Sequence, residues 1–191
     1  MNTNVKSALK YILELVHIIV ISLAIIIPIR YFLIQPFYVK GASMEPNFHD
    51  HEYLIIDEVS YRFREPERGE IIVFKYPNDP SQFFIKRIIG LPGETVEIKD
   101  NRVRIYDKDS NIGYFLNESQ YLSSSVNTYA DKKFQIGENE YFLMGDNRES
   151  SLDSRIFGPV QDKLLIGRVW LRGWPLGKFK IFHEPEYNLI Q

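Results

Sequence analysis

Hydrophobic residues are concentrated near the start of the chain, where residues 11–34 read YILELVHIIVISLAIIIPIRYFLI. The centre of this run, residues 18–29, carries no charge. Because an α-helix rises 1.5 Å per residue, the run would extend about 36 Å, enough to cross a hydrocarbon core of about 30 Å. Glu14, His17 and Arg30 lie towards its ends, where polar side chains can reach the membrane interface. The pattern predicts a membrane-spanning helix.

Two other interpretations of this run are open: a buried core helix, and a secretory signal cleaved near the small residues at 22–24. The apolar run continues past that site, which favours an uncleaved anchor. We therefore expect a cytoplasmic tail at residues 1–10, a transmembrane anchor at 11–35 and an extracytoplasmic domain at 36–191. The distribution of Lys and Arg gives only a weak preference for this orientation.

After the anchor, the pattern changes to short runs rich in β-branched and aromatic residues, which is typical of strands. A hairpin is predicted at 96–105, because polar and apolar residues alternate on both sides of Asp100-Asn101. Residues 107–138 are polar without a clear strand period, so we expect a variable insertion there. The remaining segments predict a mainly β domain. Its expected strands are 52–57, 70–76, 82–90, 140–144, 164–171 and 178–183.

Composition excludes several classes of function. The formal net charge of the 191 residues is −2, so nothing suggests nucleic-acid binding through a basic face. The chain has no cysteine, which excludes disulfides, Cys-ligated metals, iron–sulfur clusters and a thiol nucleophile. We expect neither a cofactor nor a metal.

The first candidate for chemistry is GASMEPNFHD, which contains Ser43. Gly41 permits a positive φ, and Pro46 fixes φ and removes an amide hydrogen. A serine in such a segment is commonly a turn residue, but a rigid turn also holds a nucleophile and its neighbouring N–H groups in place. His49 and His51 alternate with acids and suggest a catalytic triad or a metal site. Their position on the same local turn places them poorly for reaching the hydroxyl.

The second candidate is FFIKRIIG, residues 83–90, in which Lys86 and Arg87 point to opposite faces of a strand. Both faces are otherwise apolar, as in a strand covered on both sides, so at least one cation is expected in apolar surroundings. An edge strand with both cations in solvent is the alternative. Lowering a lysine pKa from ~10.4 towards 7 requires ~4–5 kcal/mol of destabilisation of the charged form, which burial can supply.

The third candidate is MGDNRESSLDSRIFGPV, residues 144–160, a tight loop after an apolar strand. One interpretation is a polar surface loop held by an Asp–Arg pair. The other is a part of an active site, in which serine hydroxyls orient a lysine amine and the Asp–Arg pair keeps the loop rigid.

Taken in order behind the anchor, four segments resemble the bacterial type I signal peptidases, and their single anchor is similar to that of the Gram-positive forms. The segments are GASMEP, RGEIIVF (68–74), FIKRIIGLPGE (84–94) and GDNRESSLDSR (145–155). The resemblance covers most of the chain apart from 107–138. It implies an antiparallel, barrel-like β domain that lies against membrane lipid. It also implies removal of signal peptides from exported preproteins at the outer face of the cytoplasmic membrane, near the export machinery.

Within this resemblance, Ser43 matches the nucleophile and Lys86 the general base of a serine–lysine dyad, with the Ser43 backbone N–H in the oxyanion hole. Ser151 matches the hydroxyl that orients the lysine amine. Some family members carry a further serine two residues before the nucleophile, whose hydroxyl helps to bind the oxyanion, and that position is Gly41 here. The supporting loop residues are Asp146, Asp153 and Arg155.

The leading hypothesis is therefore a membrane-anchored serine endopeptidase that cleaves signal peptides. A β domain that binds exported chains without cutting them would be expected to lack the nucleophile or the base, and both are present. A self-cleaving serine–lysine regulator shares the dyad, but the anchor and the lack of a DNA-binding domain disfavour it.

Overall fold

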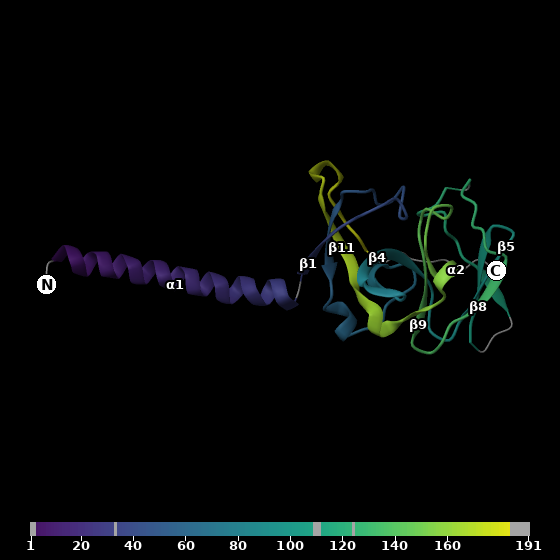
Figure 1. Cartoon of the computed structure of the whole chain (residues 1–191), viewed down its shortest axis with the longest axis horizontal. Helices are drawn as coiled ribbons and strands as arrows, with labels where there is room; N and C mark the ends of the chain where they lie inside the picture. Colours follow the sequence, from purple (N-terminus) through teal and green to yellow (C-terminus); the bar gives the residue numbers. More distant parts are fainter. Residues whose placement is uncertain (1–2, 33, 109–111, 124, 184–191) are drawn as a thin grey trace.

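A long N-terminal helix and a β body make up the computed structural model, in which α1 (Thr3–Phe32) extends away from the strands (Figure 1). Between Lys10 and Ile27 the mean hydropathy is 2.2 and none of the window is buried. Exposing such an apolar surface to water on all sides is unfavourable, so this helix fits a membrane anchor. The structure describes residues 3–32, 34–108, 112–123 and 125–183.

The chain enters the β body directly after the helix. β1 (Ile34–Tyr38) pairs antiparallel with β2 (Tyr53–Asp57), beginning with Ile34 opposite Asp57. The end of the predicted 11–35 segment is therefore strand and not helix. As a result, the loop between β1 and β2, which contains Ser43, begins close in sequence to the anchor.

The larger sheet runs in the order β1-β2-β11-β3-β4-β9-β10, with β12 beside β11, and all of its pairs are antiparallel. Every strand expected in this sheet is present, so the mainly β, antiparallel prediction is confirmed. The sequence pattern did not predict β1 or the two-residue β10. The further bounds are β3 (Ile71–Tyr76), β4 (Asp79–Gly90), β9 (Glu140–Met144), β10 (Val160–Gln161), β11 (Leu165–Trp174) and β12 (Lys180–Ile181).

The smaller sheet has the order β7-β6-β5-β8. The predicted hairpin is confirmed, and both turn residues, Asp100 and Asn101, have positive φ (50° and 60°). The polar segment 107–138, in which no strand was predicted, supplies the two edge strands. These strands have only three and four residues, too few to show a strand period, which is why the pattern did not reveal them. That this segment is a variable insertion stays a prediction. The bounds are β5 (Thr95–Lys99), β6 (Arg102–Tyr106), β7 (Gly113–Phe115) and β8 (Lys132–Gln135).

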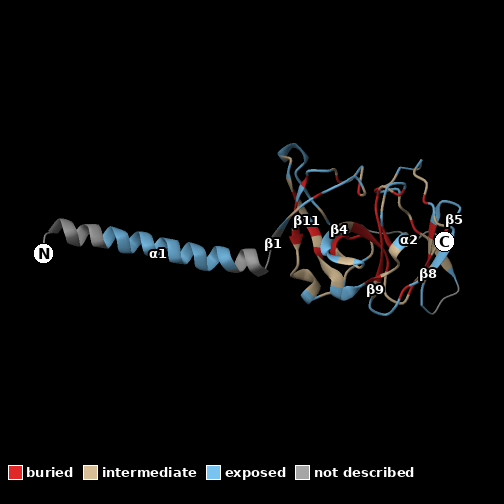
Figure 2. Cartoon of the chain, in the orientation of Figure 1, coloured by how far each residue is buried: buried red, intermediate tan, exposed pale blue. Residues whose placement is uncertain are grey.

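Buried side chains are concentrated within the β body (Figure 2). One core cluster contains Met44 and Phe48 together with Leu54 of β2 and Val73 of β3. Because Met44 is 1% and Phe48 0% exposed, the loop that carries Ser43 is packed onto the sheet. The helical elements of the body are short: η1 (Ser60–Arg62), α2 (Ser154–Phe157), η2 (Asp162–Leu164) and η3 (Leu176–Lys178).

Candidate active site

Ser43 lies in the loop between β1 and β2, where buried neighbours and backbone bonds fix it. The base of the loop is closed by a bond from Val39 N to Glu52 O (2.9 Å). Gly41 adopts a φ of 86° and donates its N–H to Asp50 Oδ1 at 2.9 Å. These constraints hold the half-buried Ser43 at one position on the surface of the sheet.

Lys86 projects from β4, which is paired on both sides by β3 and β9. Its Nζ donates to Ser43 Oγ at 2.7 Å and to Ile85 O at 2.8 Å. Lys86 is 3% exposed and Arg87 is 5% exposed. Both cations are therefore buried, which confirms the covered-strand interpretation, and the edge-strand alternative is wrong.

The environment of Lys86 disfavours its charge. Burial lowers the pKa of Lys86 to about 8, although the carboxylates of Asp153 and Asp146 act in the opposite direction. The Phe84 ring, whose centre lies 5.4 Å from Nζ, also favours the charge, but burial outweighs these contributions. At mildly alkaline pH, a substantial fraction of Lys86 is therefore neutral amine, which can accept a proton from the serine hydroxyl.

The loop after β9 contacts the nucleophile loop directly. Asn147 donates its backbone N–H to Ser43 O and its side-chain Nδ2 to Ala42 O, both at 3.0 Å. At Gly145 an added Cβ would lie 2.4 Å from Ser43 O and 2.2 Å from Ser151 Oγ. Only glycine allows the two loops to approach this closely.

A buried ion pair joins this loop to β4. Arg87 donates through Nε and Nη2 to the two carboxylate oxygens of Asp146, at 2.8 and 2.7 Å. Asn47, four residues after Ser43, donates to Asp146 Oδ2 at 2.9 Å. Because Arg87 is the neighbour of Lys86, Asp146 links the strand of the base to the loop of the nucleophile.

Asp153 and Arg155 form a second buried pair. Arg155 donates through Nε and Nη2 to Asp153, each at 2.8 Å. Asp153 also accepts the backbone N–H of Gly145 at 3.0 Å and caps the N-terminus of α2 by accepting from Arg155 N. The pair thus fixes the C-terminal end of this loop, whereas Asp146 fixes its N-terminal end.

Ser151 lies beside Gly145, where an added Cβ would be 2.2 Å from its Oγ. Among the described residues, this buried Oγ forms no hydrogen bond, so the bond to the lysine amine that the resemblance implies is not formed in this arrangement. That Ser151 orients the lysine stays a prediction.

Several residues of the site were not identified from the sequence. Asn47 and Asn147 bond the two loops together, and Gly145 allows them to approach. Their signals were available in the sequence, since Asn47 lies in the first candidate segment and the other two lie in GDNR. The histidines are not part of this arrangement: His49 pairs with Glu45 (3.6 Å) and His51 with Asp50 (2.9 Å).

An open cavity of about 550 Å³ adjoins the dyad, and Ser43 and Lys86 lie at its wall. Phe37 of β1 and Phe83 of β4 contact each other in its lining, with ring centres 5.6 Å apart. Because most of its lining is apolar, a cavity of this kind suits an apolar ligand. The other apolar lining residues include Val39, Leu54, Val73, Phe84, Ile85 and Leu152.

Comparison with known proteins gives a consistent result. The family described as "Signal peptidase, peptidase S26" matches residues 12–174. The probable signal peptidase I-2 of Synechocystis is 37% identical over 170 residues, covering 86% of this chain and 74% of that protein. Signal peptidase IB of Staphylococcus aureus is 31% identical over 187 residues, covering 93% of this chain and 97% of that protein. A crystal structure of a signal peptidase I from Enterococcus faecalis is 33% identical and covers 56% of this chain and 97% of its own, with a TM-score of 0.46.

Proposed function

The chain belongs to the signal peptidase family, peptidase S26, and we propose that it removes signal peptides from exported preproteins through a dyad formed by Ser43 and Lys86. The observation that carries this proposal is the 2.7 Å contact between Lys86 Nζ and Ser43 Oγ. The pKa of about 8 caused by burial supports the role of Lys86 as a base. A lysine outside such a site would be protonated and unable to accept a proton.

Acylation begins with the neutral amine of Lys86. It takes the proton of the Ser43 hydroxyl as Oγ attacks the carbonyl carbon at the cleavage site. The resulting ammonium returns the proton to the amine of the mature protein, which leaves as the peptide bond breaks. A water molecule, activated by the same lysine, then hydrolyses the acyl-enzyme and releases the signal peptide.

The oxyanion of the tetrahedral intermediate is assigned to the backbone N–H of Ser43. No described group accepts this N–H, whereas the N–H of Gly41 is already donated to Asp50. With no hydroxyl at position 41, this part of the oxyanion hole depends on the backbone. One such donor is typically worth ~2.7–4 kcal/mol of transition-state stabilisation.

The proposed location is the cytoplasmic membrane, with residues 1–10 in the cytoplasm, 11–35 in the lipid and 36–191 outside. The hydropathy of α1 supports the anchor. An enzyme that cleaves membrane-inserted signal peptides should keep its nucleophile near the bilayer and near the export machinery. Ser43 meets this requirement, because β1 follows the helix and leads directly into the loop that carries Ser43. Proteolysis of intact spheroplasts should therefore degrade residues 36–191; full protection of that domain would contradict this orientation.

The activity test uses the purified full chain in detergent with a preprotein that carries Ala-x-Ala at its cleavage site. We expect cleavage after the second alanine, and loss of cleavage by at least about 10³-fold in Ser43→Ala and in Lys86→Ala. Ser150→Ala, which alters an exposed serine of the neighbouring loop, is the matched control. Retained cleavage in Lys86→Ala would exclude the dyad.

A further inference from the structure

Residues 116–122, here called the bridging segment, run from the smaller sheet to the active site. At one end, Leu116 is 8% exposed and belongs to the core cluster beneath the smaller sheet. Its N–H donates to Val103 O at 2.9 Å. At the other end, Leu122 N donates to Glu118 O at 2.9 Å and closes a tight turn. The segment is thus fixed to a sheet that contributes none of the predicted site residues.

Glu118 of the bridging segment holds Arg148 of the loop after β9, residues 145–153, here called the catalytic loop. Arg148 Nη1 donates to Glu118 Oε2 at 3.0 Å, and Nη2 donates to the other carboxylate oxygen. The Arg148 side chain is fully buried, and its Nε donates to Gly145 O at 3.1 Å. Nη1 also donates to Thr128 Oγ1 at 2.8 Å. A bidentate pair fixes both distance and orientation, so the position of Glu118 is transmitted to Gly145.

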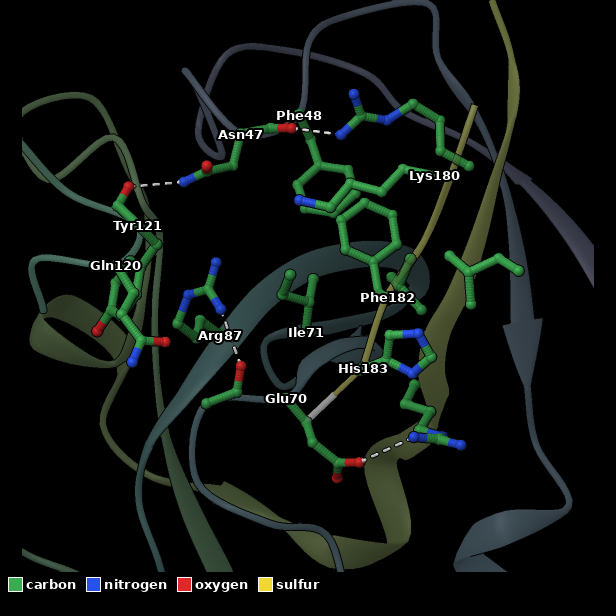
Figure 3. Close-up of a pocket in the computed structure, with 15 residues that line it drawn as sticks. Asn47, Phe48, Glu70, Ile71, Arg87, Gln120, Tyr121, Lys180, Phe182 and His183 are labelled. Carbon is green, nitrogen blue, oxygen red and sulfur yellow. Dashed lines mark hydrogen bonds and ion pairs between the residues drawn. The ribbon is translucent and has the colours of Figure 1, made fainter. Parts of the chain in front are cut away.

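Tyr121 of the same segment contacts Asn47, Arg87 and Glu118. Its backbone oxygen accepts from Asn47 Nδ2 at 2.8 Å (Figure 3). The Arg87 guanidinium lies 4.0 Å from the centre of its ring, and its hydroxyl donates to Glu118 Oε1 at 2.7 Å. Asn47 and Arg87 line the pocket that Figure 3 shows, together with Tyr121.

The partners of Tyr121 are the residues that flank the dyad. Arg87 follows Lys86 in β4, and Asn47 lies in the nucleophile loop; both bond Asp146 of the catalytic loop. Tyr121 is 8% exposed, so its ring also covers the buried Arg87–Asp146 pair. The bridging segment therefore contacts three elements of the site. They are β4, which carries Lys86, the loop that carries Ser43, and the catalytic loop, which bonds both.

We propose that Tyr121 and Glu118 are positioning residues of the active site: they hold the nucleophile loop, β4 and the catalytic loop at the separation at which Lys86 meets Ser43. This inference rests on the proposed function. It assigns a role to the 107–138 region, whose polar sequence gave no indication of one.

Removal of the Tyr121 ring has a consequence beyond lost stability. Water would reach Arg87 and Asp146, and β4 would be free to shift beside Lys86. Less complete burial of Lys86 would raise its pKa towards the value of a free lysine. A side chain that only stabilised the fold would change the folded fraction and leave the pH profile of the folded enzyme unmoved.

The test compares Tyr121→Leu and Tyr121→Phe with Tyr129→Leu, which alters an exposed tyrosine of the same region. Glu118→Gln and Glu138→Gln form a second pair, since Glu138 is exposed and forms an ion pair with Lys108 at the surface. The full chain in detergent is assayed for kcat and KM between pH 6 and 10, and thermal unfolding gives the folded fraction. The Lys86 pKa is read independently by NMR of ¹³C-labelled lysine.

For Tyr121→Leu we expect kcat to fall about tenfold or more with KM nearly unchanged, and the Lys86 pKa to rise by about half a unit or more. Tyr121→Phe should keep the Lys86 pKa, because it retains the ring. Glu118→Gln should lower kcat in the same way, which keeps the test informative if Tyr121→Leu fails to fold. The two controls should match the wild type.

A wild-type kcat and Lys86 pKa in Tyr121→Leu and Glu118→Gln would overturn the inference. So would a loss of rate that only follows the folded fraction. If Ser43→Ala is inactive in the same assay, such a result rejects the positioning role alone. If Ser43→Ala cleaves normally, the proposed function itself fails.

Discussion

Lys86 Nζ lies 2.7 Å from Ser43 Oγ, although the two residues are 43 positions apart in the chain. The contact forms because Met44 and Phe48 pack the nucleophile loop onto the sheet that contains β4. Arg87 and Asp146 then hold the adjacent loop, so the half-buried serine meets a buried lysine at the wall of the open cavity. The predictions below test the chemical and structural consequences of that environment.

The cleavage rate should rise with pH through about 8. Burial lowers the pKa of Lys86 to about 8, and only the neutral amine can accept the serine proton. Initial rates between pH 6 and 9.5, at saturating and at limiting substrate concentration, measure this rise. A rate that is independent of pH across this range would contradict a lysine base.

Lys86→Met should be more stable than the wild type at pH 7, by about 1–3 kcal/mol, while losing activity. The variant removes a buried cation and keeps the length of the side chain. A pKa of about 8 in the folded chain, against 10.5 as the ordinary value, corresponds to a penalty of a few kcal/mol. Urea unfolding at fixed pH measures the difference.

The difference in unfolding free energy between Lys86→Met and the wild type should shrink between pH 8 and 10.5. In that window the unfolded lysine still binds a proton and the folded one does not, so wild-type stability rises with pH through this group. Lys86→Met lacks this dependence. A constant difference from pH 7 to 10.5 would show that burial does not perturb Lys86.

Gly41→Ala should destabilise the protein by about 1–2 kcal/mol and reduce activity. A Cβ at this position meets nothing within 4 Å, so the penalty comes from the φ of 86° and not from a clash. Gly41→Ser should show the same penalty despite its added hydroxyl. Gly177→Ala is the control, since its Cβ also meets nothing and its φ is not positive. Equal effects at both glycines would refute the conformational explanation.

Asp146→Ala should destabilise the protein by about 3–5 kcal/mol, because it leaves the buried guanidinium of Arg87 without its main carboxylate partner. Asp107→Ala, at an exposed acid, should change stability by less than about 0.5 kcal/mol. Thermal or denaturant unfolding monitored by circular dichroism compares the two. An unperturbed Asp146→Ala would mean that the pair does not hold the loop.

Ser151→Ala should not destabilise the protein and should lower kcat about tenfold or more. The buried hydroxyl has no partner among the described residues, so its removal breaks no bond of the resting structure. If it turns towards the Lys86 amine during the reaction, only the rate suffers. An unchanged kcat would remove Ser151 from the proposed machinery.

The sequence by itself determined the helix, most of the strands and the candidate chemistry. The uncharged run at 18–29 predicted the helix, and period-two alternation predicted β5 and β6, because both signals are local properties of the chain. The ordered motifs around Ser43, Lys86 and residues 145–155 indicated the family. The apolar neighbours of Lys86 and Arg87 also indicated a covered strand, which the 3% and 5% exposures confirm.

Only the tertiary structure decided what surrounds the dyad. Whether Ser43 was a turn residue or faced a base depended on long-range packing, which local patterns do not encode. The unbonded hydroxyl of Ser151, the φ of Gly41 and the bond from Asn47 to Tyr121 likewise follow from how distant segments meet. Edge strands β7 and β8 have only three and four residues, too few to show a strand period, so the pairing of their backbones with β6 and β5 revealed them. Contacts between residues far apart in sequence position the reacting atoms, and these contacts exist only once the sheets have formed.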